Sequence, residues 1–90
     1  METLAGIREF CENNSQLRAK WRKVASIGLQ IHIFELENAL HSLHGRTPKK
    51  NERLYLDFRS ALFELRERCA KFGISVSDTI NPENISELLR

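Results

Sequence analysis

Apolar side chains recur at alternating steps of three and four residues in two long stretches of the chain. Such steps are typical of helices that pack along a shared seam. The first stretch holds Leu29, Ile33, Leu36, Leu40 and Leu43, and the second holds Tyr55, Phe58, Leu62, Leu65, Cys69 and Phe72. Because only a few residues separate the stretches, we expect an antiparallel helical hairpin with these two stripes as its seam.

Start and stop signals predict four helices in a single domain, residues 1–90, at about 3–13, 16–44, 48–72 and 82–89. Asn14 and Ser15 interrupt the pattern after the first segment. Gly45 stands where the second helix is expected to end, and Pro48 suits the first turn of the third. The fold class is therefore all-α, with two long helices and short helices at both ends.

The second helix carries another apolar stripe, out of phase with the first. It consists of Leu17, Trp21, Val24, Ile31 and Phe34, so residues 27–36 are apolar around most of the helix. A two-helix hairpin cannot cover such a segment on every side. The first helix, the last helix or a second copy of the chain must do so, and we expect a homodimer that completes a bundle.

A strand remains an alternative for the middle of this helix. Residues 27, 29, 31 and 33 are apolar and alternate with Gly28, Gln30 and His32, which is the period of a half-buried strand. Ile74 and Val76 would form a second short strand in a small α+β fold. Helical patterns on both flanks, with no turn signal between them, favour the helix.

The composition sets limits on size and compartment. Ninety residues, 41% of them hydrophobic, build one modest core, which excludes a two-domain enzyme. The start of the chain has no signal-peptide pattern and no apolar run long enough to cross a membrane, so we expect a cytoplasmic protein. Cys11 and Cys69 form no Cys-x-x-Cys motif and are expected to be buried, reduced thiols.

The net charge is only +2, but basic residues cluster in two places. Arg18, Lys20, Arg22 and Lys23 surround Trp21, and Arg46, Lys49, Lys50 and Arg53 surround the expected turn. Such clusters could neutralise phosphates, which makes a small nucleic-acid-binding regulator the alternative function. Helical spacing directs Arg18, Arg22 and Lys23 away from the stripe that holds Trp21, which favours a solvated face.

Candidate chemistry is sparse. Glu37, His41 and His44 share one helical face at spacings that suit a transition metal, but no fourth ligand accompanies them, and we expect no metal site. No phosphate loop, paired acids or nucleophile with an adjacent base occurs, so we expect no enzyme and no cofactor.

These observations predict a non-enzymatic protein–protein interaction module, acting as a regulator, adaptor or chaperone through helix packing. Two apolar surfaces are candidates for the interface with another protein or with a second copy. The first comprises Trp21, Ile27, Ile31 and Phe34, which the seam leaves uncovered, and the second comprises Ile85, Leu88 and Leu89 of the last helix. That short helix docks either on its own hairpin or in a groove of the partner.

Overall fold

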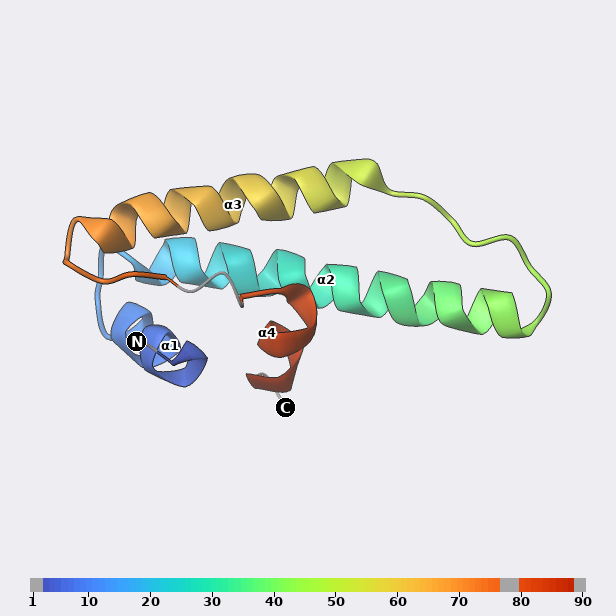
Figure 1. The fold of residues 1–90 in the computed structure, drawn as a ribbon, viewed down its shortest axis with the longest axis horizontal. Coiled ribbons are helices and arrows are strands. Elements are labelled where there is room, and N and C mark those ends of the chain that lie inside the picture. The colour runs from blue at the N-terminus through green and yellow to red at the C-terminus, as the bar shows by residue number, and fades with distance from the viewer. Residues whose placement is uncertain (1–2, 77–79, 89–90) are drawn as a thin grey trace.

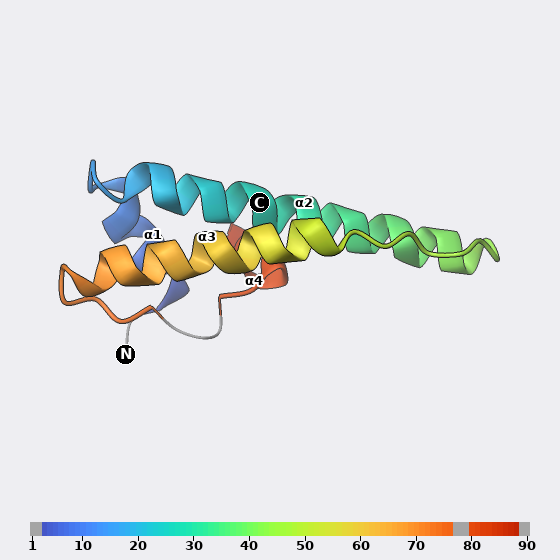
Figure 2. The ribbon, with the colours of Figure 1, turned by 90° about the horizontal axis from the view of Figure 1, so that it is seen from above.

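The computed structural model describes residues 3–76 and 80–88, and it contains four α-helices. They are α1 (Leu4–Glu12), α2 (Arg18–Leu43), α3 (Glu52–Ala70) and α4 (Pro82–Leu88). The molecule is elongated, with principal extents of 48 × 24 × 21 Å. Helices α2 and α3 form an antiparallel hairpin, and α1 and α4 lie along one side of this hairpin with most of their contacts on α2 (Figure 1). A view from above shows that the end of α2 reaches well beyond the other helices (Figure 2).

Side-chain caps fix the starts of α1, α3 and α4, whereas α2 begins without one. The Thr3 hydroxyl accepts a hydrogen bond from the Gly6 N–H at 3.0 Å at the start of α1. The Asn81 side chain accepts one from the Asn84 N–H at 2.9 Å and so caps α4. These contacts satisfy backbone donors that have no partner within the first turn of a helix.

Two glycines in the left-handed conformation end the long helices, as the sequence predicts. Gly45 has φ +70° and Gly73 has φ +75°. In each case the N–H of the residue after the glycine bonds a carbonyl five residues earlier, Arg46 to His41 at 2.7 Å and Ile74 to Cys69 at 3.1 Å. This is the Schellman ending, which needs a residue with positive φ and therefore favours glycine.

The start of the third helix differs from the prediction. Thr47 and Pro48 do not begin it; Asn51 is the N-cap, with its side chain accepting from the Leu54 N–H at 3.2 Å. Residues 46–51 instead run as a connection along α2. Asn38 of α2 binds the Lys49 backbone through two hydrogen bonds of 2.9 Å, and this long-range contact holds the connection out of helical conformation.

The core lies around the first half of α2, which is covered by α3, α4 and α1. Trp21, Val24, Ala25, Gly28 and Ile31 form the buried face of this helix. The buried positions of the other elements are Ile7, Cys11, Leu17, Phe58, Ala61, Leu65, Cys69, Ile80 and Ile85. Gly28 lies where three helices meet, because a Cβ added there would be 3.2 Å from Phe58 Cε2 and 3.3 Å from Ile85 Cδ1.

The structure confirms one sequence-based prediction about α2, the helix over residues 27–33, and contradicts another, the position of the seam. Residues 27–33 are helical, and the described part of the chain contains no strand, so the α+β alternative is excluded. The predicted seam is incorrect on the α2 side. The face of α2 that packs on α3 is the one with Trp21 and Ile31, and the stripe from Leu29 to Leu43 lies on the surface.

No helix among the described residues is long and apolar enough to cross a membrane.

Candidate functional site

The most unusual surface of the molecule is a row of exposed aliphatic side chains on α2, which we call the distal stripe. Its members follow heptad steps and lie on a different face from the buried residues of the same helix. They are Leu29, Ile33, Leu36, Leu40 and Leu43, with exposed fractions of 36, 47, 54, 56 and 80%. The exposed fraction thus rises steadily toward the end of the helix.

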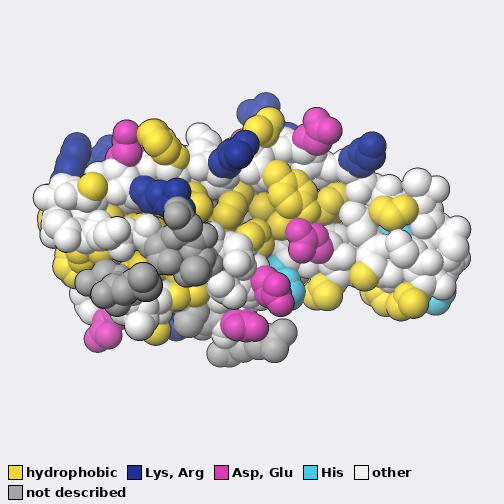
Figure 3. Space-filling model, viewed as in Figure 1, with side chains coloured by type: hydrophobic (Ala, Val, Ile, Leu, Met, Phe, Trp, Pro, Cys, Tyr) yellow, Lys and Arg dark blue, Asp and Glu magenta, His cyan; other side chains and the backbone are white. Residues whose placement is uncertain are grey.

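The stripe is exposed because the covering helices stop before α2 does. Helix α4 lies against the middle of α2, and α3 begins near Phe34, so beyond this point only the connection 46–51 accompanies α2 (Figure 1). We call residues 33–43 the arm. Apolar side chains gather along the edge of this arm in the space-filling view (Figure 3). Soluble monomers rarely leave a continuous apolar row of this kind uncovered.

The base of the arm is held in place from the opposite face. The Phe34 and Tyr55 rings meet edge to face, with centroids 6.5 Å apart. The Tyr55 hydroxyl donates a hydrogen bond to a Glu35 carboxylate oxygen at 2.9 Å. Desolvation, followed by this bond to Glu35, raises the pKa of the Tyr55 phenol. These contacts turn the inner face of α2 toward α3 and leave the distal stripe facing outward.

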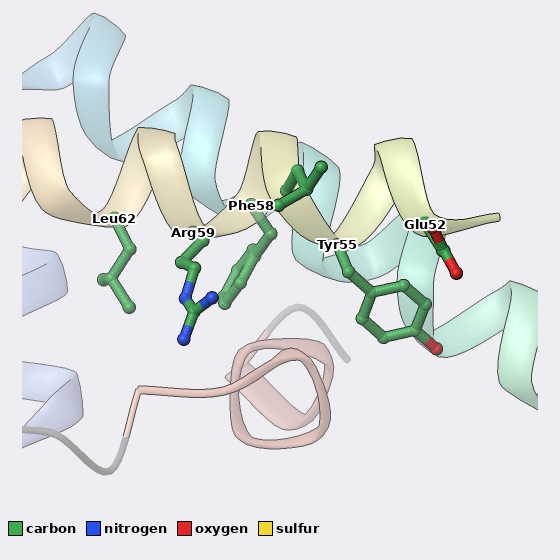
Figure 4. A pocket seen from close by; sticks show the side chains of 6 residues that line it. Glu52, Tyr55, Phe58, Arg59 and Leu62 are labelled. Atoms are coloured by element: carbon green, nitrogen blue, oxygen red, sulfur yellow. The ribbon is translucent and has the colours of Figure 1, made fainter.

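A second apolar surface lies on α3. A hollow of about 570 Å³ is lined by Glu52, Tyr55, Leu56, Phe58, Arg59 and Leu62. The aromatic rings of Tyr55 and Phe58 extend from α3 toward the side where α4 lies (Figure 4). The hollow is open and largely apolar, and its phenol is already bonded to Glu35, so it offers contact area rather than convergent polar chemistry.

The residues predicted to form the interface differ in how far they are exposed. Trp21, Ile31 and Ile85 are 2, 0 and 0% exposed, so the single chain encloses them and they present no surface to a partner. Ile27 and Phe34 are half-buried. They are covered because α3 and α4 pack on two sides of α2, whereas the prediction had placed α3 on the distal stripe.

Two members of the predicted second surface cannot be placed in this way. Leu89 and the side chain of Leu88 lie outside the described residues. The described part of α4 docks on its own hairpin through Ile85, which was one of the two arrangements expected from the sequence.

The first basic cluster is largely engaged within the chain. Lys20 pairs with Glu64 at 2.9 Å and Arg22 pairs with Glu12 at 3.2 Å. The Arg18 Nε donates to the Glu12 carbonyl at 2.9 Å. The hydrogen bond from Lys20, then its charge, lowers the pKa of Glu64. Carboxylates therefore offset the charges of Lys20 and Arg22, while Arg18 binds a neutral carbonyl and keeps its charge.

The second basic cluster contributes to structure as well as to charge. Arg53 pairs with Asp57 across one turn of α3, at 3.1 Å. Lys49 is held through its backbone by Asn38, while the side chains of Lys49 and Lys50 lie in exposed positions. The two clusters are separated along the hairpin, since Arg18–Lys23 begin α2 and Arg46–Arg53 follow its end.

The metal candidates line a shallow hollow without forming a ligand set. Glu37, His41 and His44 border it together with Leu40 and Arg46. Among the described residues there is no group of three or more histidine, cysteine, aspartate or glutamate side chains placed to hold a metal ion.

Comparison with known protein families, with curated protein sequences and with solved structures found no match for this chain.

Proposed function

We propose that this protein is a non-enzymatic interaction module that binds by helix packing, with the distal stripe as its contact surface. The observation that carries the proposal is the exposure of five aliphatic side chains at heptad steps on one face of α2, four of them in the arm. In the prediction from sequence, this surface was assigned to the hairpin seam. Because the stripe is exposed and Trp21 and Ile31 are buried, we assign the binding role to the stripe instead of to these two residues.

The size of the surface supports a specific contact. From the exposed fractions, the stripe presents on the order of 500 Å² of apolar surface, at the upper end of what a typical monomer leaves in one patch. Two such surfaces together bury about 1,000 Å², which reaches the lower bound for a biological interface. The half-exposed flanks of the arm add to this area.

The occupant that we propose is the arm of a second copy. Heptad spacing is self-complementary, because the same alternation of three and four lets two helices of equal pattern interlock. Residues 24–45 contain no lysine or arginine, and Glu35 and Glu37 are their only acids, so two arms meet with little like-charge repulsion. Towards the body the same helical face continues with Arg22 and Arg18, which confines the contact to the arm.

Light scattering of the purified chain tests the proposal. We expect twice the mass of one chain, and we expect Leu36→Glu to restore the mass of a single chain with unchanged helical content, because Leu36 is 54% exposed and contributes little to the core. Phe63→Glu is the matched control: Phe63 is 60% exposed on α3, outside the stripe, and its replacement should leave the dimer intact.

A wild-type chain that stays monomeric at high concentration would overturn the dimer. A dimer that persists in Leu36→Glu would show that another surface makes the contact.

A further inference from the structure

The two cysteines lie side by side in the core, although 58 positions separate them in the sequence. Cys11 is in the last turns of α1 and Cys69 in the last turn of α3, and their Sγ atoms are 4.0 Å apart. Both are free thiols and both are 0% exposed. The neighbouring Phe10 and Phe72 rings meet edge to face, with centroids 6.1 Å apart, so α1 also contacts the turn that follows α3.

The separation of the sulfurs is within reach of a covalent bond. A disulfide needs an S–S distance of about 2 Å, so each sulfur has to move by about 1 Å. Rotation about the Cα–Cβ bonds and a small shift of α1 supply such a movement. Helix α1 has nine residues, too few to persist alone in water, and its buried residues are Ile7 and Cys11. A short helix with few anchors can adjust its position at small cost.

We propose that Cys11 and Cys69 are a modification site at which a hydroperoxide forms an intrachain disulfide that fastens α1 to the end of α3. In the first step, one cysteine sulfur attacks a peroxide oxygen. The O–O bond breaks, the leaving oxygen departs as water once it has taken the thiol proton, and the attacked oxygen remains on sulfur as a sulfenic acid.

In the second step, the other sulfur attacks the sulfenic sulfur and displaces its oxygen as a second water. The two sulfurs give up two electrons, and the two peroxide oxygens accept them. Two thiols and one hydrogen peroxide thus yield one disulfide and two waters.

Burial decides which oxidant suits the site. A bulky disulfide reagent would have to place a mixed disulfide among Ile7, Cys11 and Cys69, all of which are fully enclosed. Hydrogen peroxide is small and uncharged and leaves no such group behind. Burial also raises the pKa of both thiols, so they stay protonated at neutral pH and are expected to react slowly with the peroxide.

The disulfide would act on the body of the molecule and leave the distal stripe unchanged. It closes a loop that contains all of α2 and nearly all of α3, and a long closed loop restricts the unfolded chain strongly. The site lies at the open end of the hairpin, where α3 ends and α2 begins, opposite the arm (Figure 1). Oxidation is therefore expected to raise the melting temperature without changing the oligomeric state.

The experiment uses the reduced, folded full-length chain, freed of reductant and treated with hydrogen peroxide. Intact mass spectrometry should show the loss of two hydrogen atoms, and a non-reducing digest should join the peptides that contain Cys11 and Cys69. Dithiothreitol should restore the original mass. The melting temperature of the oxidised chain should be higher by several degrees, and this rise should be absent in Cys11→Ser and Cys69→Ser.

Three outcomes would overturn the proposal. The mass could increase by whole oxygen atoms with no cross-link, the disulfide could form only between two chains, or it could form only after denaturation. Since each is read from the mass of the wild-type chain, none depends on whether the serine variants fold.

Discussion

Gly28 provides the most direct test of how the helices pack. A Cβ at this position would lie 3.2 Å from Phe58 Cε2 of α3 and 3.3 Å from Ile85 Cδ1 of α4. Gly28→Ala gains about 1 kcal/mol of helix propensity, which compression of these two side chains offsets, so we expect a change within about 0.5 kcal/mol. Gly28→Val adds two further carbons between three helices, and overpacking of this kind costs about 1–3 kcal/mol.

We therefore expect Gly28→Val to lower the free energy of unfolding by about 2 kcal/mol and the melting temperature by roughly 10 °C. Urea and thermal unfolding followed by circular dichroism at the helical band measure both quantities. Ala19→Val is the control, because Ala19 lies on an exposed part of α2 and its replacement changes only helix propensity, by about 0.5 kcal/mol. Equal effects of Gly28→Val and Ala19→Val would refute the close approach of α4 and α3 at this glycine.

Three further predictions concern a cap, the core and pH. Asn81→Ala removes the acceptor of the Asn84 N–H and should destabilise the protein by about 1 kcal/mol in urea unfolding. Leu65→Ala, at a side chain with 0% exposure, should cost about 2–5 kcal/mol, whereas Phe63→Ala, at 60% exposure, should cost far less. Burial, then the nearby Cys69, raises the pKa of Cys11 from 9.0 to about 12, so the folded chain holds a proton that the unfolded chain releases. Stability from this group is complete below pH 9 and is lost as the pH rises towards 12, and a wild-type unfolding curve that falls no faster than that of Cys11→Ala over this range would contradict the prediction.

The local signals in the sequence were sufficient to place the helices. The four segments and both glycine endings follow from periodicity, caps and the conformational freedom of glycine. The start of α3 was missed because it depends on Asn38, which holds Lys49 from a distance of 11 positions in the chain. A cap signal such as Thr47–Pro48 shows only that a helix could begin there, and a long-range hydrogen bond can hold the same residues in another conformation.

The assignment of faces on α2 failed for a different physical reason. The distal stripe consists only of leucine and isoleucine at regular heptad steps, so counting apolar residues selects it as the seam. The buried face contains Ala25 and Gly28 instead, and small residues let neighbouring helices approach closely. The space that the missing side chain of Gly28 leaves is filled by Phe58 and Ile85, and the stabilisation comes from these two residues. Both are distant from Gly28 in the sequence. The contact between Cys11 and Cys69 could not be predicted from the sequence for the same reason, because 58 positions separate them.

The two halves of helix α2 thus lie in different environments. Its first half is stabilised by burial against three helices of the same chain, while the arm is held at its base by Tyr55 and near the turn by Asn38. A helical segment of this length is only marginally stable on its own in water, so the arm has the least intrinsic support of any part of α2. A partner on the distal stripe would supply the burial that the arm lacks, and binding would then stabilise the helix that makes the contact. This coupling gives a physical reason for the leucines at positions 36, 40 and 43, because these exposed side chains contribute little to the core of a single chain.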